Sequence, residues 1–279
     1  MARIFISYRR DDSAGYAGRL YDRLGTDFGA DNLFMDIAAT EPGVDFADAI
    51  EQAVSGCDIL LAVIGRQWLT ITDGAGRRRL ENPDDFVRLE IAAALKRNIR
   101  VIPVLVQGAA MPHAEQLPEP LKPLTRRQAQ ELSDGRWQYD IDRLLTVLKK
   151  VLQSQELDEL VAQFAQAEAQ EAGDDVIAVG ERILQVDAQH QPTRSKTALA
   201  YNNRANSYHH KREYDKAIAD CTRAIELNPN FAAAYYNRGV VYKRRNEAQA
   251  ARRDFERAAA LGLEDAKKAL LPLWKRLLA

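Results

Sequence analysis

A 34-residue repeat in the second half of the chain constrains its fold more than any other feature. The stretch AYNNRANSYHHKREYDKAIADCTRAIELNP begins at Ala200, and AYYNRGVVYKRRNEAQAARRDFERAAALGL begins 34 residues later at Ala234. A period of this length without strand patterns predicts stacked helical hairpins, because a single hairpin cannot bury its own apolar face. The matching positions carry tyrosines and alanines: Tyr201 with Tyr235, Tyr208 with Tyr242, Ala217 with Ala251, and Ala224 with Ala258.

The period and the repeated positions resemble the tetratricopeptide repeat (TPR), a helical hairpin with small residues where its two helices cross. The two clear copies cover residues 198–231 and 232–262. A weaker helical pair is predicted over 156–190, and a last helix over 264–278 is expected to cap the stack. The all-α repeat domain is therefore predicted to span residues 159–279.

The groove of such a domain is expected to bind a partner. The resemblance implies that the first helix of each repeat turns a set of side chains into this groove: Asn202, Asn206, His209, Tyr236, Val240 and Lys243. A protein or peptide of unknown identity, another copy of this chain or a phage component would suit it. A packing surface used only for self-assembly explains the same residues equally well.

The first half of the chain alternates short apolar runs with amphipathic segments. This pattern predicts an α/β domain over residues 1–152, with a linker at 153–158 that lacks Gly and Pro and is expected to be helical. Strands that are apolar on both faces predict a parallel sheet covered by helices on both sides, in a flavodoxin-like arrangement of five strands. The predicted strands are residues 3–8, 32–36, 58–65, 100–106 and a weaker one at 128–132.

Composition narrows the range of partners. The 279 residues include 39 Lys and Arg against 40 Asp and Glu, so no overall field favours nucleic acid or an anionic membrane. No apolar run approaches the ~18 residues of a membrane helix, and the chain is expected to be cytoplasmic. Cys57 and Cys221 both lie in apolar periodic segments and are expected in the core, and the pair His209 and His210 lacks companion ligands at metal spacing.

The candidate functional residues lie at the carboxyl ends of the predicted strands. Ligands gather at this edge in parallel sheets of this kind. A helix that begins after Pro83 carries Phe86 and Glu90, which are four residues apart and so lie on one face, with Glu90 at the edge of the core beside an aromatic ring. The residues expected at this edge are Tyr8, Arg9, Arg10, Asp36, Gly65, Trp68, Phe86 and Glu90.

The strand FISYRR, the FMD at the second strand and the helix FVRLEIAAAL resemble a bacterial TIR (Toll/interleukin-1 receptor) domain of the kind that consumes NAD⁺. The resemblance covers residues 1–150 and implies that Glu90 is catalytic. It places Arg9 and Arg10 at the nucleotide and makes residues 37–45 a loop that packs against a neighbouring TIR domain. NAD⁺ is then the substrate, and no cofactor is expected.

Cleavage of NAD⁺ at its nicotinamide bond is compatible with a single carboxylate. Most glycosidases use two, one of which protonates the leaving oxygen. Nicotinamide leaves as a neutral molecule from a cationic pyridinium, so one carboxylate near the ribose is enough to stabilise the developing charge. Attack by water would give ADP-ribose, and attack by another part of the nucleotide would give a cyclic product.

Several of the candidate residues have a plainer interpretation. Asp36 could bond backbone amides in its loop, which is slightly favoured over a ribose contact, and Trp68 could be packing instead of a base-stacking ring. Arg9 and Arg10 could be exposed loop charges. For the whole protein the alternative function is a non-catalytic adaptor that uses its TIR surface only to bind other TIR domains.

Overall fold

The computed structural model describes residues 3–35 and 45–277, with side chains described as far as residue 270. The chain divides into two compact units, Met1–Leu152 and Gln153–Ala279. The first unit contains these strands and α-helices: β1 (Ile4–Ser7), α1 (Arg10–Phe28), β2 (Leu33–Met35), α2 (Phe46–Ser55), β3 (Ile59–Ile64), α3 (Phe86–Lys96), β4 (Arg100–Val106), β5 (Gln130–Leu132) and the first half of α4 (Trp137–Ala169). Short 3₁₀ turns connect them: η1 (Ala30–Asn32), η2 (Arg79–Glu81), η3 (Ala114–Gln116), η4 (Glu119–Arg126) and η5 (Asp134–Arg136).

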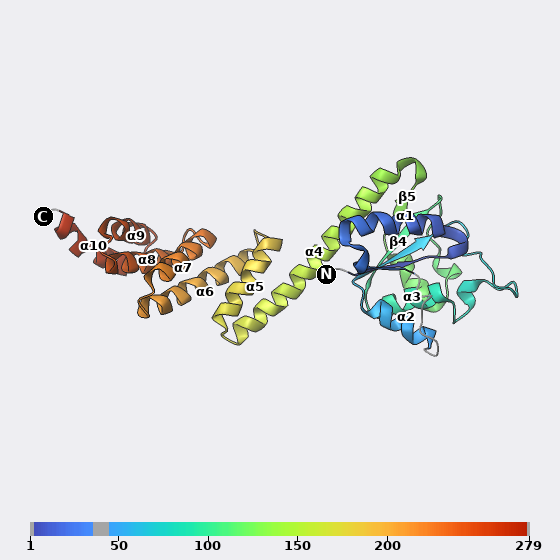
Figure 1. Ribbon diagram of the computed structural model, residues 1–279, viewed down its shortest axis with the longest axis horizontal. Helices are drawn as coiled ribbons and strands as arrows, with labels where there is room; N and C mark the ends of the chain where they lie inside the picture. Colours follow the sequence, from blue (N-terminus) through green and yellow to red (C-terminus); the bar gives the residue numbers. More distant parts are fainter. Residues whose placement is uncertain (1–2, 36–44, 278–279) are drawn as a thin grey trace. The chain divides into compact units, whose positions relative to one another are not determined.

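The first unit is a five-stranded parallel sheet in the order β2-β1-β3-β4-β5. This confirms the predicted flavodoxin-like sheet, including its weak fifth strand. Alternate residues of each strand face opposite sides, so Ile4 and Ile6 pack with α1 and α4, whereas Phe5 packs with α2 and α3. Figure 1 shows α1 on one side of the sheet and α2 with α3 on the other. Both faces of the sheet are therefore covered by helices, and the carboxyl ends of the parallel strands lie along one edge.

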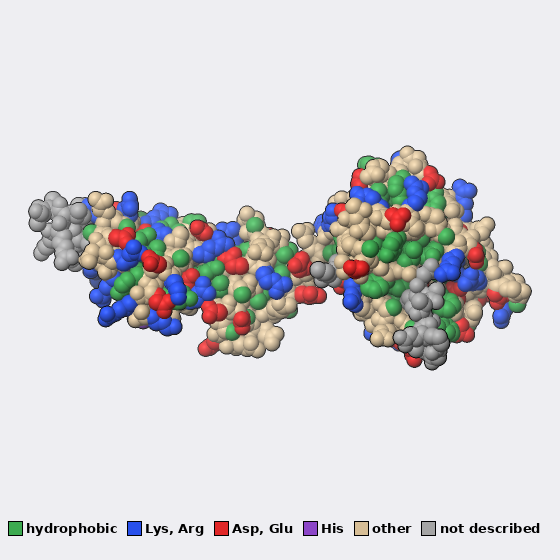
Figure 2. All heavy atoms as spheres, viewed as in Figure 1, with side chains coloured by type: hydrophobic (Ala, Val, Ile, Leu, Met, Phe, Trp, Pro, Cys, Tyr) green, Lys and Arg blue, Asp and Glu red, His purple; other side chains and the backbone are tan. Residues whose placement is uncertain are grey.

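The second unit is entirely helical over its described residues. It contains the second half of α4, followed by α5 (Gly173–Val186), α6 (Gln191–His210), α7 (Tyr214–Leu227), α8 (Ala232–Arg244), α9 (Ala248–Ala260) and α10 (Glu264–Leu277). The helical repeat domain predicted from the 34-residue period is confirmed, with α6–α7 and α8–α9 as the two clear hairpins. Figure 2 shows acidic and basic side chains interspersed over the visible face of this unit, in line with the balanced composition.

α4 runs without interruption through residues 153–158, which the sequence predicts to be a helical linker. Its early turns bury Ile141, Leu144 and Leu148 against the sheet. Its later turns bury Leu160 and Phe164 in the core of the helical unit. A single helix therefore contributes to both hydrophobic cores.

Each of the two clear repeats contains a partly buried ion pair that the aromatic and alanine pattern did not reveal. Arg204 binds Asp220 through two hydrogen bonds of 2.8 and 2.9 Å, and Arg238 binds Asp254 with the same two lengths. These side-chain hydrogen bonds raise the pKa of both arginines. Each pair joins the first helix of a hairpin to the second and fixes their crossing.

Both cysteines lie in the cores, as the sequence predicts: Cys57 is 6% exposed and Cys221 is fully buried. Burial raises the pKa of the Cys57 thiol to about 11 and that of Cys221 to about 12. A raised pKa leaves little thiolate at pH 8, and thiolate is the reactive form. We expect protein unfolded in guanidinium to react with two equivalents of a thiol-specific dye. In the same time the native protein should react with less than about one tenth of an equivalent. Rapid labelling of either cysteine in the native state would contradict this assignment.

No helix among the described residues is long and apolar enough to cross a membrane.

Candidate functional site

Glu90 is held in a buried position at the carboxyl end of β1. Asp85 caps α3 by accepting a hydrogen bond of 3.0 Å from the backbone N–H of Arg88, and Glu90 follows in the second turn. The side chain of Glu90 is only 7% exposed, and the Ser7 hydroxyl donates a hydrogen bond of 2.6 Å to its Oε2. The structure therefore places a carboxylate at the carboxyl ends of the strands, with one oxygen oriented by Ser7 of β1.

Arg9 has a different position from the one expected. Its guanidinium donates two hydrogen bonds of 3.0 Å to the carboxylate of Asp85, and the two side chains are 1% and 2% exposed. An arginine buried in this way does not reach a pyrophosphate, so the expected ligand contact of Arg9 is corrected to a structural ion pair. The pair ties the end of β1 to the first turn of α3, five residues before Glu90, and so fixes the position of that carboxylate.

Trp68 also belongs to the core. The residue is 1% exposed and packs in the hydrophobic cluster beneath α2 and α3, so its indole is not available to stack on a base. The guanidinium carbon of Arg9 lies 6.0 Å from the centre of this ring, within the range of a cation–π contact. The structure thus favours the packing interpretation of Trp68.

Gly65 follows β3, and its lack of a side chain makes room for Asp12. One carboxylate oxygen of Asp12 accepts a hydrogen bond of 2.8 Å from the backbone N–H of Gln67. A Cβ atom at Gly65 would lie only 2.3 Å from the other oxygen of Asp12. Gly65 therefore allows the loop after β3 to close against the start of α1, and no other residue type fits there without a shift.

Replacing Gly65 by Ala is expected to lower the free energy of unfolding by about 1–3 kcal/mol, because the added methyl group overlaps the Asp12 carboxylate. Thermal and urea unfolding of the full chain would measure the loss. A second change, Asp12→Ala, removes the overlapping group. Gly65→Ala should therefore cost less stability when it is added to Asp12→Ala than when it is made in the wild type. An unchanged unfolding midpoint for Gly65→Ala would rule out this account of the glycine.

The other candidates at this edge lie on its periphery. Tyr8 is half-buried against the α1 side of the sheet, and Arg10 is exposed at the start of α1. Phe86 is 47% exposed, and its ring centre lies 5.1 Å from that of Phe46 on α2. Asp36 and residues 37–44 of the predicted self-association loop lie outside the described residues; Asp45, the last residue of that loop, caps α2 by accepting a hydrogen bond from Ala47.

Three residues of this edge were missed by the sequence reasoning: Ser7, Asp12 and Asp85. Asp85 carries a recognisable signal, since an Asp directly before an apolar helical stripe is a preferred N-cap. Ser7 and Asp12 carry none, because their partners are far away in the sequence. Among the described residues no cluster of three or more His, Cys, Asp or Glu could hold a metal ion.

In the helical unit the predicted groove residues have different environments. Asn202 is 5% exposed and accepts a hydrogen bond of 2.8 Å from Asn237, so its expected role in the groove is corrected to a contact between α6 and α8. Burial and the neighbouring His210 lower the pKa of His209. Asn206 is half-buried. Tyr236 and Lys243 line a pocket of about 310 Å³ together with Val240, Arg244, Phe255 and Ala269.

Comparison with known families agrees with both units. The family model described as "TIR domain" matches residues 4–145, which is just over half of the chain. The chain belongs to the TIR domain family. Two models described as "Tetratricopeptide repeat" match residues 198–231 and 221–253 of the helical unit of this TIR protein. The predicted order, a TIR domain followed by TPR repeats, is thereby confirmed.

Curated relatives match a part of this TIR protein. Sperm-associated antigen 1 of Mus musculus is 40% identical over 55 residues, which are 20% of this chain and 6% of that protein. Tetratricopeptide repeat protein 36 of Homo sapiens is 38% identical over 80 residues, 27% of this chain and 42% of that protein. The chain thus spans less than half the length of either relative.

Solved structures of TPR domains also resemble the chain. The first TPR of Spaghetti (RPAP3), bound to the HSP90 peptide SRMEEVD, is 22% identical, covers 45% of this chain and 96% of its own, and has a TM-score of 0.31. The OM64 TPR domain of Arabidopsis is 20% identical and covers 44% of this chain and 98% of its own, with a TM-score of 0.31.

Proposed function

We propose that this TIR protein cleaves NAD⁺ at the bond between nicotinamide and ribose. The observation that carries the proposal is the Glu90 carboxylate, buried at the carboxyl ends of the strands and bound by the Ser7 hydroxyl. A carboxylate with little access to water interacts more strongly with a positive charge that develops beside it. The oxocarbenium-like ribose that forms as nicotinamide leaves is such a charge.

The reaction requires a carboxylate beside the ribose and no general acid for the leaving group. The C1′–N bond of NAD⁺ breaks with both electrons going to the pyridinium nitrogen, which becomes neutral, so no acid is needed for the leaving group. The Ser7 hydroxyl orients the Glu90 carboxylate through Oε2, and the negative charge of that carboxylate acts on the ribose. Water then attacks the sugar to give ADP-ribose, or an adenine nitrogen or ribose hydroxyl attacks to give a cyclic product.

We propose that Arg10 binds the diphosphate of NAD⁺. Arg9 is engaged in its buried pair with Asp85, whereas Arg10 is exposed at the start of α1. The N-terminal end of a helix attracts anions, and an arginine there adds a fork of donors that suits phosphate oxygens. The exposed ring of Phe86 supplies an apolar surface on the same face of α3 as Glu90.

The test is direct measurement of nicotinamide. The purified full chain is incubated with NAD⁺ over a range of protein concentrations, and products are separated by chromatography against nicotinamide, ADP-ribose and cyclic ADP-ribose standards. Release that rises more steeply than protein concentration would support activation by self-assembly of the TIR domains. Absence of nicotinamide at every concentration and under crowding would overturn the enzymatic function and leave the alternative, an adaptor that binds other TIR domains.

The repeats are proposed to choose the partner that triggers assembly, in bacterial immunity or another response that depletes NAD⁺. The pocket beside Tyr236 and Lys243 supports this role, because its apolar walls end at two exposed cations, Lys243 and Arg244. A peptide that places an apolar side chain next to a carboxylate would suit it.

A further inference from the structure

An arginine in the chain between β3 and α3 reaches across the carboxyl ends of the strands. Nη1 of Arg79 lies 3.4 Å from Oδ2 of Asp11 in the first turn of α1, and its Nε lies 3.4 Å from Oδ2 of Asp85, the N-cap of α3. α1 packs on one face of the sheet and α3 on the other, and the strand order changes direction between β1 and β3. Arg79 therefore lies across the place where parallel sheets of this kind bind ligands.

The backbone around Arg79 is held in place by its own loop and by α3. The N–H of Arg79 donates a hydrogen bond of 2.9 Å to the carbonyl of Ile71. Leu80, the next residue, is 2% exposed and packs in the core. The Arg88 guanidinium donates hydrogen bonds of 3.2 and 2.9 Å to the carbonyls of Leu80 and Glu81. Arg79 thus extends from a fixed stretch of backbone, and its side chain is 35% exposed and accessible to a ligand.

The two ion pairs of Arg79 compensate its charge only in part. Both contacts are longer than the roughly 2.7–3.2 Å of a normal N–H···O hydrogen bond. Asp85 already accepts two bonds of 3.0 Å from Arg9, so two guanidiniums share one carboxylate. Asp11 is 72% exposed, and water and salt weaken its attraction to Arg79. A stronger acceptor can therefore take the place of Asp11.

We infer that Arg79, together with Arg10, binds the diphosphate of NAD⁺, and that phosphate oxygens replace the Asp11 carboxylate on its guanidinium. The identity of this ligand rests on the proposed function. The guanidinium fork matches phosphate oxygens, and hydrogen bonds between two charged groups are the strong ones. Asp11 then acts as a competitor that the substrate displaces.

The positions of Arg79 and Glu90 suit two parts of one nucleotide. Glu90 accepts a hydrogen bond from Ser7, whereas Asp85, which contacts Arg79, accepts bonds from Arg9, two residues further along the chain. Two residues of chain span at most about 7 Å, so the two carboxylates are anchored close together. In NAD⁺ the nicotinamide ribose is joined to its phosphate through a single CH₂–O link. A ribose beside Glu90 therefore brings its phosphate toward Arg79.

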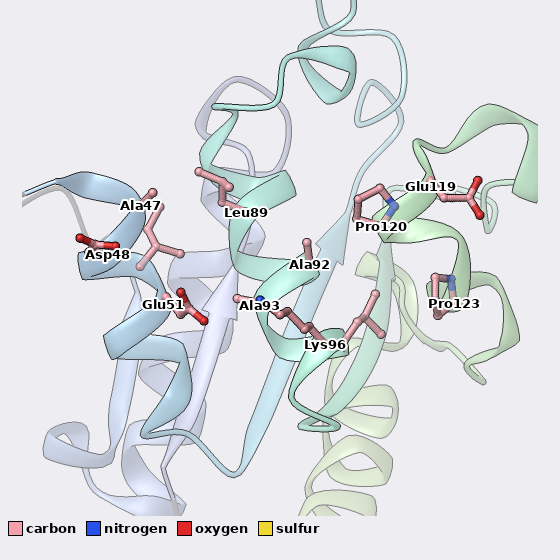
Figure 3. Close-up of a pocket in the computed structure, with 12 residues that line it drawn as sticks. Ala47, Asp48, Glu51, Leu89, Ala92, Ala93, Lys96, Glu119, Pro120 and Pro123 are labelled. Carbon is pink, nitrogen blue, oxygen red and sulfur yellow. The ribbon is translucent and has the colours of Figure 1, made fainter.

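A hollow of about 570 Å³ on the outer face of α3 suits this anion less well. Figure 3 shows it between α2 on one side and the turn with Pro120 and Pro123 on the other. Its charged lining residues are three acids and one base: Asp48, Glu51, Glu119 and Lys96. An excess of negative charge repels a diphosphate, whereas the two guanidiniums at Asp85 attract it.

The test is isothermal titration calorimetry of the full chain with ADP-ribose, which carries the same diphosphate and binds without being cleaved. Arg79→Gln should weaken binding by about tenfold or more, because a hydrogen bond between charged groups is lost. Arg77→Gln is the matched control: it changes an arginine of the same loop that binds Asp73, and it should bind ADP-ribose like wild type. Circular dichroism would verify that each variant is folded.

Asp11→Asn distinguishes contact with the ligand from a structural role of Arg79. It removes the charge that competes for the guanidinium, so ADP-ribose should bind about two- to fivefold more tightly than to wild type. In the Arg79→Gln background the same change should have a clearly smaller effect, because the competition is already absent. An arginine that only holds its loop would instead lose part of its support in Asp11→Asn, and binding would weaken.

Three results would overturn the inference: a wild-type chain that does not bind ADP-ribose, an Arg79→Gln variant that binds it as tightly as wild type, and an Asp11→Asn change that has the same effect with and without Arg79. Nicotinamide release combined with unchanged affinity in Arg79→Gln would leave the proposed function intact and remove Arg79 from the site. The expected binding pattern without nicotinamide release would support the role of Arg79 and overturn cleavage.

Discussion

Replacing Glu90 by Gln is expected to reduce nicotinamide release from NAD⁺ by at least about 100-fold, because removal of one preorganised electrostatic contact to a transition state costs this much in other enzymes. The substitution keeps the size of the side chain and its ability to accept the Ser7 hydrogen bond. What it removes is the negative charge that the proposed function requires beside the ribose. Steady-state rates measured by chromatography at several NAD⁺ concentrations would separate this loss in kcat from weaker binding.

Two further variants make the Glu90 result specific. Glu115→Gln changes an exposed glutamate in η3 and should leave the rate unchanged. Ser7→Ala removes the donor that orients Oε2 and should lower the rate by a smaller factor than Glu90→Gln, about tenfold for the loss of one hydrogen bond to a charged group. A Glu90→Gln protein that is folded and as active as wild type would exclude Glu90 as the catalytic residue.

Replacing Asp85 by Ala is expected to destabilise the first unit by about 3–5 kcal/mol, the usual cost of leaving one member of a buried ion pair without its partner. The Arg9 guanidinium is only 1% exposed and would lose both of its bonds to Asp85. The change also removes the N-cap of α3, which adds a cost of about 1 kcal/mol. Urea unfolding followed by the fluorescence of the three tryptophans, of which Trp68 lies in the core of this unit, would measure the loss.

A second variant separates the stabilisation that comes from the ion pair from that of the N-cap. Arg9→Leu combined with Asp85→Asn removes the buried positive charge while keeping a side chain that can cap α3. This double variant should be more stable than Asp85→Ala, even though it contains more changes. An unfolding free energy for Asp85→Ala within about 1 kcal/mol of wild type would mean that water reaches Arg9 and that the pair is not closed.

The fold could be predicted from sequence because its signals are periodic and local. The 34-residue repeat and the alternation of strands with amphipathic helices each extend over many residues, so single irregular positions did not disturb the prediction. Asn246 is an example: it takes the left-handed conformation in a turn where glycine is more usual, and asparagine tolerates that conformation.

The candidate site was predicted only in part, and the errors share a physical cause. Glu90 lies at the strand ends as expected, because helical spacing places it beside the core. Arg9 and Trp68 were expected at the ligand, yet both are buried. Whether a residue at a strand end is exposed depends on what covers it, and here the chain between β3 and α3 supplies the cover. Such a contact between distant segments leaves no mark in the local pattern.

The ion pairs of the two clear repeats have a consequence for how this protein changes over evolutionary time. In each pair the arginine and the aspartate are 16 residues apart and belong to the same hairpin: Arg204 with Asp220, and Arg238 with Asp254. Each 34-residue repeat therefore contains both members of its own ion pair. When a repeat is duplicated or lost, each of these arginines keeps its aspartate. These two ion pairs therefore place no constraint on the number of repeats, in contrast to the bonds that join neighbouring hairpins, such as that between Arg238 and Thr222.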